Sequence, residues 1–338
     1  MRTLKRILFA ILFIPACLIL LCAVGWDIYR RIQFNKPGNI MVGELSYPAV
    51  GEMDRRGFVV WEYIIPGLPG EGETGGNVFV RRLKNGNTLV VNQVLNKVLE
   101  VSRAKKLVWE YGDATRGEHL HWPRRARRSA NGDTYIVDSG NDRLIRVNQQ
   151  REIVWEYSSQ DSALRVTDVH VVGEELKHIV FSKDGHFVAG YFELDESGKP
   201  RNHRWVDKYP GTNLQFLDNG NVLISGYNFY VWELDSAGVV VWEYSLPREE
   251  PTDAEELVTN PRPISAAVKL SNGDVLVARD RSFPSPSPNY VQVSEAKHIL
   301  KQYGLNKIMT CWYLVLGRGR SAFSFYTWSR SLQIIEEP

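Results

Sequence analysis

The chain has 338 residues, of which 43% are hydrophobic and 24% charged, and its formal net charge is +2. This composition is typical of a globular protein with a large core. The small net charge gives none of the basic excess that points to nucleic acid as a partner. The three cysteines, Cys17, Cys22 and Cys311, are too few and too scattered to imply a disulfide framework.

The N-terminal segment is apolar. Residues 7–26 carry no charge, and a helix of this length spans the core of a bilayer. Basic residues precede it on a short tail, so residues 1–30 predict a membrane anchor that leaves the rest of the chain on the extracytoplasmic, periplasmic side. Two alternatives remain open, a cleavable signal peptide with a site at Ala23-Val24-Gly25 and a lipoprotein with its box at Ile14-Pro15-Ala16-Cys17.

A short phrase recurs along the rest of the chain. Val59-Val60-Trp61-Glu62-Tyr63 returns around Trp109, Trp155 and Trp242, with a degenerate copy around Trp205. A repeat at this spacing indicates stacked supersecondary units. Apolar and polar residues alternate within the phrase, which is the period of a half-buried strand. Each copy therefore predicts the closing strand of one unit, with its tryptophan packed between neighbouring units.

A second phrase, a tight-turn pair followed by an apolar run, precedes the tryptophan strands. It occurs at Asn85-Gly86, Asn131-Gly132, Asp184-Gly185, Asn219-Gly220 and Asn272-Gly273. Asn-Gly and Asp-Gly between apolar runs are strong hairpin signals, because such turns need positive φ. The second unit shows the full set of expected strands, at 126–129, 134–137, 144–147 and 153–157. Four antiparallel strands per unit are typical of a propeller blade.

The sequence therefore predicts an all-β protein, a six-bladed β-propeller of four-stranded antiparallel blades over residues 56–338, preceded by one N-terminal transmembrane helix. Residues 31–55, which are polar with Pro and Gly, predict a stalk. The tail lacks an Asn-Gly turn but holds three apolar runs, at 308–316, 322–328 and 332–335. Three strands there and the orphan strand at 57–63 would complete the sixth blade and close the ring. A diverged blade and a corrupted reading frame are both open explanations for this tail.

Polar residues gather at the positions expected on the channel face opposite the turns. The candidate ligand-binding residues are Arg124, Arg125, Lys177, Asn213 and Arg279, and the candidate catalytic residues are His121, His170 and His178. A net-basic mouth over a channel suits an anionic ligand. Among these histidines, His178 is assigned to the channel mouth of a first strand. His119-x-His121 alone does not predict a metal site.

Other polar residues in these units have a structural interpretation. Arg127 and Arg128 are matched by Arg81 and Arg82 one unit earlier, which suggests repeat scaffolding. Asp138, Asn141 and Arg143 are interpreted as a turn that ties strands within one blade. The acidic, proline-flanked stretch 247–263 is an exposed connection with partner binding as an alternative role.

The repeat resembles that of bacterial arylsulfotransferase-like propellers and of NHL-type six-bladed propellers. The resemblance rests on Asn85-Gly86-Asn87-Thr88-Leu89-Val90, on Asp138…Asn141-Asp142-Arg143 and on Ile153-Val154-Trp155-Glu156-Tyr157, and covers residues 57 to about 304. It implies a propeller and, for a sulfotransferase, an axial histidine that accepts the sulfuryl group with arginine support. Most units lack that histidine. Quinoprotein propellers repeat a tryptophan too, but their Thr-Gly-Lys lead-in is absent, so no cofactor is expected.

Two functions follow as hypotheses. The first is a membrane-anchored extracytoplasmic propeller that binds an anionic small molecule, such as an aryl sulfate, or a cell-envelope partner at the channel mouth. The second is an active aryl-sulfate sulfotransferase, in which His178 is the preferred nucleophile and arginine or lysine neighbours stabilise the sulfuryl oxygens. Fold alone does not choose between them.

Overall fold

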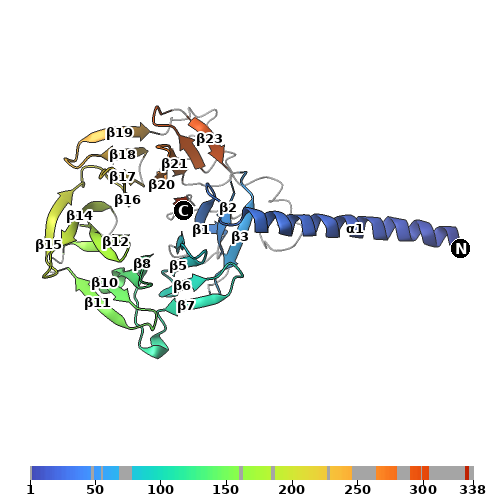
Figure 1. Cartoon of the computed structure of the whole chain (residues 1–338), viewed down its shortest axis with the longest axis horizontal. Helices are drawn as coiled ribbons and strands as arrows, with labels where there is room; N and C mark the ends of the chain where they lie inside the picture. The colour runs from blue at the N-terminus through green and yellow to red at the C-terminus, as the bar shows by residue number, and fades with distance from the viewer. Residues whose placement is uncertain are drawn as a thin grey trace, which may run out of the picture.

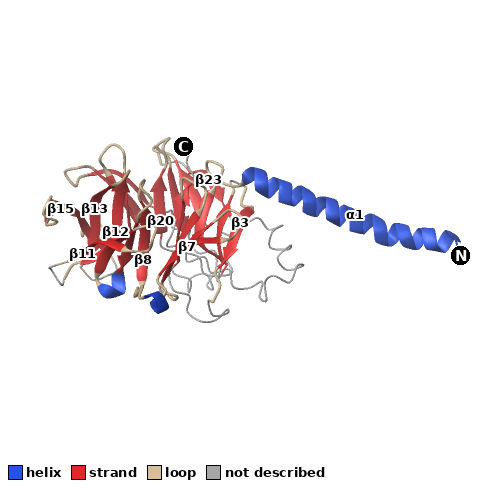
Figure 2. Cartoon of the chain, turned by 60° about the horizontal axis from the view of Figure 1, so that its bottom comes forward, coloured by secondary structure: helices blue, strands red, loops and turns tan. Residues whose placement is uncertain are grey.

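A computed structural model describes residues 2–46, 49–54, 56–67, 78–159, 163–183, 187–226, 229–245, 264–279, 290–297, 299–303 and 332–334. The described strands form six four-stranded antiparallel sheets arranged around a central axis. A long helix, α1 (Arg2–Gln33), extends away from the ring (Figures 1 and 2). The all-β propeller of four-stranded antiparallel blades expected from the repeats is confirmed.

The sheets follow one another along the chain, and each runs outward from the axis (Figure 1). The first sheet holds β1 (Ile40–Ser46), β2 (Ala49–Met53), β3 (Val59–Ile64) and β24 (Leu332–Ile334). The second and third hold β4 (Val78–Arg82), β5 (Thr88–Asn92), β6 (Lys97–Val101), β7 (Leu107–Tyr111), β8 (Pro123–Arg128), β9 (Thr134–Asp138), β10 (Arg143–Val147) and β11 (Ile153–Ser158). Two short 3-10 helices, η1 (Ala114–Arg116) and η2 (Ser139–Asn141), lie in this part of the chain.

The remaining three sheets repeat the pattern. They hold β12 (Arg165–Val172), β13 (Glu175–Ser182), β14 (Val188–Leu194), β15 (Pro200–Trp205), β16 (Asn213–Phe216), β17 (Val222–Ser225), β18 (Tyr230–Leu234), β19 (Val240–Ser245), β20 (Ile264–Lys269), β21 (Val275–Arg279), β22 (Tyr290–Val293) and β23 (Ile299–Tyr303). In Figure 1 the first strand of each of these sheets lies toward the axis and the last strand lies at the rim.

The ring closes differently from the sequence-based prediction. The first sheet has the order β24-β1-β2-β3, so three strands come from the N-terminal side and one from the C-terminal side, not one and three. The backbone of Ile40 pairs with Ile334, and that of Val42 with Leu332. Residues 31–55 are therefore not a stalk, because β1 and β2 lie within them. The runs 308–316 and 322–328 lie outside the described residues.

The physical reason is that the apolar run at the start of β1 is buried. Ile40, Met41 and Val42 are at most 1% exposed and pack into the cores on both sides of their sheet. The stalk was predicted from the flanking Pro and Gly, whereas the apolar run Ile40–Val42 indicates a buried strand.

The helix covers and exceeds the apolar segment 7–26. Within the part of the chain that the structure describes, no helix combines the length and hydropathy needed to cross a membrane.

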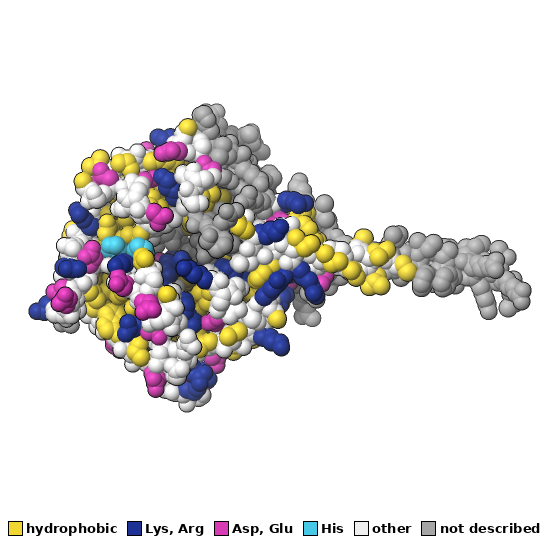
Figure 3. Space-filling model, in the orientation of Figure 1, with side chains coloured by type: hydrophobic (Ala, Val, Ile, Leu, Met, Phe, Trp, Pro, Cys, Tyr) yellow, Lys and Arg dark blue, Asp and Glu magenta, His cyan; other side chains and the backbone are white. Residues whose placement is uncertain are grey.

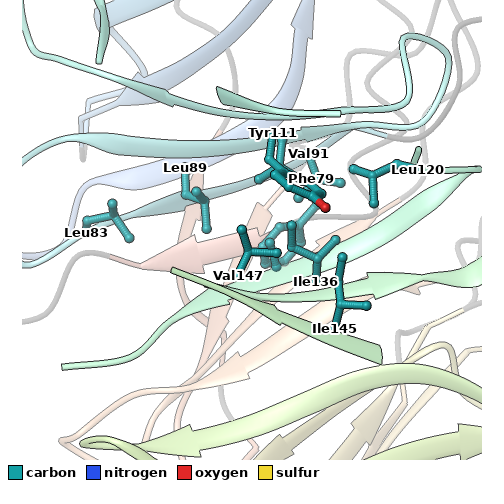
Figure 4. Packing of buried hydrophobic residues seen from close by; sticks show 11 residues of the cluster. Phe79, Leu83, Leu89, Val91, Tyr111, Leu120, Ile136, Ile145 and Val147 are labelled. Carbon is teal, nitrogen blue, oxygen red and sulfur yellow. The ribbon is translucent and has the colours of Figure 1, made fainter. Parts of the chain in front are cut away.

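Successive sheets are held together by apolar layers. Figure 4 shows one such layer, in which Phe79, Leu89 and Val91 of one sheet pack against Ile136 and Ile145 of the next. Comparable clusters of described residues join every pair of neighbouring sheets. They include one that joins β20 and β21 to β1 and β2, so the apolar core runs round the whole ring.

The Asn-Gly turns form as predicted, with a different dihedral pattern. Gly86 has φ +82°, but Asn85 does not adopt positive φ. The amide of Gly86 donates to the carbonyl of Leu83 at 2.9 Å, and the amide of Leu83 donates to the carbonyl of Asn87 at 2.8 Å. Only the glycine therefore needs the left-handed region, because the turn is a type I turn followed by a bulge.

The basic residues that end the first strands clamp neighbouring sheets. Arg82 donates to Glu52 of the preceding sheet at 2.6 Å, and its guanidinium lies 4.9 Å from the centre of the Trp61 ring. Arg128 repeats this geometry with Glu100, at 2.6 Å, and with Trp109. Lys269 pairs likewise with Glu233. The scaffolding role predicted for Arg82 and Arg128 is confirmed.

In the fourth sheet, β12–β15, the strands differ in position from the sequence-based prediction. Its first strand is β12, and the turn after it contains Gly173 at φ +61°. The Asp184-Gly185 pair falls between β13 and β14, not after the first strand. His178 therefore lies on the second strand, and His170 is the histidine of the axial strand.

Candidate functional site

The structure separates the predicted site residues into two groups. His121 is exposed and is fixed within its own blade: its amide donates to Asp138 at 2.7 Å, and its Nδ1 lies 3.2 Å from the carbonyl of Gly140. Lys177 is also exposed and pairs with Glu175 two residues away. The side chain of His121 is thus held by its own blade and that of Lys177 by Glu175, although the charge of Lys177 still acts on the adjacent His178.

The carboxylate of Asp138 organises the loop that holds His121. It is fully buried and accepts from Asn141 and from Nε of Arg143, each at 2.8 Å. Arg143 also donates to the carbonyl of His119 at 2.8 Å. The prediction that Asp138, Asn141 and Arg143 tie strands within one blade is confirmed.

His170 and His178, in contrast, form a pair across β12 and β13. Their Nδ1 atoms are 3.1 Å apart, and their rings are coplanar to within 3°. Both rings stack on Phe216 of β16, each with a centroid distance of 4.4 Å. Tyr191 of β14 meets the His178 ring edge-on at 5.3 Å. Three sheet strands and a neighbouring sheet thus fix the orientation of both imidazoles.

The contacts of the pair assign its protons. A hydrogen bond between two ring nitrogens needs one proton, so one ring donates and the other accepts. Nε2 of His178 lies 3.7 Å from the carboxylate of Glu193, which favours a proton on that nitrogen. His178 then accepts at Nδ1, and His170 donates from Nδ1 and keeps a bare Nε2.

Both histidines are held neutral. Burial, with His178 and Arg127 nearby, lowers the pKa of His170 to about 4. Burial also lowers the pKa of His178, and Glu193 opposes that effect. Near neutral pH the pair therefore offers hydrogen-bonding and nucleophilic nitrogens without positive charge.

An arginine cluster adjoins the pair. Arg127 of β8 donates to Asp168 of β12 at 2.7 Å, and Nε of Arg125 lies 3.6 Å from the same carboxylate oxygen. Both guanidinium groups lie 4.9 Å from the centre of the Phe79 ring. Repulsion from Arg127, followed by burial, lowers the pKa of Arg81 to about 9, whereas Asp168 raises it. Three arginines from two blades therefore face one another around a single carboxylate of the described residues.

Arg125 also contacts a sheet that is not adjacent to its own. It is 7% exposed, and its Nη2 donates to Oδ1 of Asn213 at 2.9 Å. These residues belong to the third and fifth sheets, so the contact passes over the intervening sheet of β12. Figure 3 shows histidine side chains beside a group of lysine and arginine side chains near the centre of this face of the ring. The prediction that Arg125 and Asn213 come together is consistent with this contact.

The two remaining predicted residues are Arg124 and Arg279. Arg124 lies on β8 beside Arg125 and is partly exposed. Arg279 ends β21, where its backbone pairs with Ile264, and its side chain lies outside the described residues. Among the residues that the structure describes, no group of three His, Cys, Asp or Glu side chains is placed to hold a metal ion.

Several members of the site were not predicted from the sequence. Arg81 and Arg127 were assigned to scaffolding together with their neighbours, although successive residues of a strand point to opposite faces and therefore have different roles. Asp168 and Phe216 carry no motif. Asp168 and His170 are two residues apart on β12, so both lie on the same face of that axial strand, and this spacing could have indicated the site. It was overlooked because Asp184-Gly185 was assigned to the turn after the first strand of this sheet.

No family model matches this sequence, and no curated protein matches it. Among solved structures, a protein of unknown function from Bacteroides caccae aligns with 89% of this chain and 100% of its own, at 15% identity and a TM-score of 0.58. A streptogramin B lyase aligns over 80% of both chains, at 14% identity and a TM-score of 0.50. Selenomethionine-substituted virginiamycin B lyase from Staphylococcus aureus covers 80% of this chain and 81% of its own, at 12% identity and a TM-score of 0.50. At these identities the likeness concerns the β-propeller fold alone.

Proposed function

We propose that the propeller binds an anionic ligand near its axis, through Arg81, Arg125 and Arg127. The observation that carries this proposal is the charge imbalance at Arg81 and Arg127, whose two guanidinium groups lie near one described carboxylate, Asp168. In addition, Nη1 of Arg127 is buried without a hydrogen-bond partner among the described residues. An aryl sulfate and an anionic group of a cell-envelope partner are both ligands of this chemistry.

The physical reason is the cost of confining like charges. Burial removes water from the guanidinium groups of Arg81 and Arg127, and Asp168 offsets one of their two charges. A bound sulfate or carboxylate would offset the rest, because planar guanidinium groups bind such oxygens in pairs. The neutral His170 and His178 rings lie beside the arginine cluster and add no positive charge to it, so the arginines supply the attraction for the anion.

The test is a calorimetric titration of the full chain with sulfate and with 4-nitrophenyl sulfate. We expect Arg127→Ala to weaken binding by about tenfold or more, because it removes a charge-assisted contact. Arg165→Ala is the matched control, since Arg165 is an exposed arginine of the neighbouring strand β12 that pairs with Asp142. Equal affinities of the wild type and Arg127→Ala, with both folded, would contradict the proposal.

A second candidate, an aryl-sulfate sulfotransferase, is favoured by the bare imidazole nitrogen. Nε2 of a neutral histidine would attack the sulfur of the donor, the bond from sulfur to the aryl oxygen would break, and the phenolate would leave. A phenolic acceptor would then take the sulfuryl group from the histidine. The proton assignment favours His170 for this step, with His178 as its hydrogen-bond partner, in place of the His178 nucleophile expected from the sequence.

This candidate is tested by release of 4-nitrophenol from the aryl sulfate in the presence of a phenolic acceptor. His170→Ala is expected to abolish release. His178→Ala, which removes a positioning residue, is expected to leave a rate reduced by roughly 10²–10³-fold. Absence of turnover by the wild-type protein, with sulfate binding intact, leaves the anion-binding function and removes the enzymatic one.

We also propose that residues 7–26 anchor the protein in a membrane, with the propeller on the periplasmic side. The support is the uncharged sequence and the exposure of Ile19, Leu20 and Leu21, which are 63–67% exposed in the protein alone. Protease added to intact spheroplasts is expected to digest the propeller. Protection until lysis would place the propeller on the other side.

A further inference from the structure

The end of α1 is joined rigidly to the ring. Nε of Arg30 donates to the carbonyl of Val60 in β3 at 3.1 Å, and Nη2 of Arg103 donates to the carbonyl of Arg31 at 2.7 Å. The amide of Asn35 donates to the buried carboxylate of Glu52 at 2.6 Å. The helix therefore leaves the ring in a fixed direction, and anything that holds the helix also positions the rim beside it.

An aromatic cluster fills this junction. Trp26 stacks on Tyr29 at 5.4 Å and meets Phe58 of the ring edge-on at 5.5 Å. The hydroxyl of Tyr29 donates to Asp54, and the guanidinium of Arg56 lies 5.5 Å from the centre of the Tyr29 ring. Trp26 and Tyr29 remain partly exposed. Tryptophan and tyrosine with one apolar side and one wet side are typical of the interface of a bilayer.

Basic residues lie at the end of α1, before β3 and in the turn between β6 and β7, and this turn contacts the helix end through the hydrogen bond from Arg103 to Arg31. We call them the basic collar; they are Arg30, Arg31, Arg56, Arg103, Lys105 and Lys106. All except Arg30 are exposed. The described carboxylates among them are Asp27, which pairs with Arg31 at 2.8 Å, and Asp54, which is 3% exposed. Figure 3 shows lysine and arginine side chains around the point where the helix leaves the ring. The collar therefore has excess positive charge.

Side chains change along the helix axis in a definite order. Exposed apolar residues such as Leu21 and Val24 come first, then the aromatic cluster, and then the basic collar. Hydrocarbon, interface and headgroup follow one another in the same order across a leaflet.

We propose that the basic collar binds the headgroups of anionic phospholipids, so that the rim of the β1–β3 and β4–β7 sheets rests on the bilayer surface. The inference rests on the proposed membrane anchor and adds a second contact to it. The contacts between α1 and the ring support this proposal. A flexible stalk would let the collar move away from the bilayer surface, whereas the fixed helix holds the collar next to it.

The experiment uses the full chain with vesicles of phosphatidylcholine alone and vesicles with about one-third phosphatidylglycerol. Acetylation of Lys105 and Lys106 is followed by mass spectrometry relative to Lys199, an exposed lysine near β15. We expect the two collar lysines to react several-fold more slowly in the anionic vesicles, and high salt to remove the difference. Equal relative rates in both vesicles would overturn the collar proposal.

A charge-reversal pair provides the control. Arg31→Glu with Arg56→Glu is expected to abolish the protection of Lys105 and Lys106, whereas Arg165→Glu with Arg201→Glu leaves it intact. Flotation with phosphatidylcholine vesicles after a high-salt wash tests the anchor separately. Flotation without lysine protection overturns the collar alone, and loss of flotation with lysine protection retained overturns the anchor alone.

Discussion

At the residue scale, the most consequential feature is the set of buried charge pairs between sheets. The side chains of Glu52 and Arg82 are 0% and 3% exposed, and Glu52 also accepts from the amides of Asn35 and Asn39. Removing one partner of such a pair leaves the other charge without water or a counter-ion. The pair links the end of the helix, the first sheet and the second sheet, so its loss would act at all three.

We predict that Glu52→Ala lowers the free energy of unfolding by about 3–5 kcal/mol. Glu175→Ala is the control, because its pair with Lys177 is exposed to solvent and its loss is expected to leave the stability nearly unchanged. Urea denaturation of the two variants measures the difference. Equal small losses would show that the Arg82 guanidinium finds another partner in the variant.

His170 makes the stability depend on pH in a predictable direction. Its pKa in the folded protein is about 4, below the ordinary value of 6.5. As pH falls through this window, the unfolded chain takes up the proton first, so stability falls with falling pH. The stabilising contribution of the neutral ring is complete above pH 6.5 and lost near pH 4.

The expected result is that His170→Gln flattens the dependence of the urea midpoint on pH between these two values. His203→Gln serves as control, because His203 is an exposed histidine of β15. A slope unchanged in His170→Gln and reduced in the control would mean that His170 is not the group whose protonation is linked to unfolding.

At the element scale, the shortest described strand closes the ring. β24 has three residues and pairs with β1, and it also contacts β20 and β4 of the neighbouring sheets. Without β24, the backbone groups of β1 that face the axis would lose their partners, and the first sheet would present an open edge.

A chain that ends before Leu332 is therefore predicted to melt at a clearly lower temperature than the full chain. Removal of the last four residues alone, 335–338, is the matched control because it leaves β24 in place. Calorimetry measures both. An unchanged melting temperature in the longer truncation would show that β24 contributes nothing to closure.

At the scale of the whole molecule, the axial site depends on closure, because its residues come from four sheets. Arg81 belongs to the second sheet, Arg127 to the third, His170 to the fourth and Asn213 to the fifth. These side chains meet only when the blades are packed in the ring, so the unfolded chain offers no equivalent site. A ligand that binds here stabilises the folded state by mass action.

Sulfate is accordingly expected to raise the melting temperature of the wild type, with a gain in stability that grows as the logarithm of its concentration above the dissociation constant. At 100 times its dissociation constant, the gain would be about 2.7 kcal/mol. Arg127→Ala is expected to lose this concentration-dependent gain, and Arg165→Ala to keep it. Equal gains in all three proteins would indicate a general salt effect rather than a site.

The sequence by itself determined the repeating part of the fold. The tryptophan phrases and the Asn-Gly turns encode local geometry, a two-residue period and a glycine at positive φ, and such geometry is fixed by neighbouring residues. It therefore indicated four-stranded blades around an axis, and it separated the structural turn at Asp138 from the polar residues of the channel. The repeat also indicated, for the same reason, that Arg82 and Arg128 have the same structural role in successive sheets.

Tertiary structure decided what depends on distant parts of the chain. The pairing of β1 with β24 joins segments about 290 residues apart. The apolar run Ile40–Val42 is compatible with a strand, but nothing in residues 31–55 identifies the strand with which it pairs. The meeting of Arg125 with Asn213, and of His170 and His178 with Phe216, likewise requires sheets that come together only in the closed ring. The charge imbalance around Asp168 exists because folding brings arginines of separate blades into one space, where burial makes the repulsion between them matter.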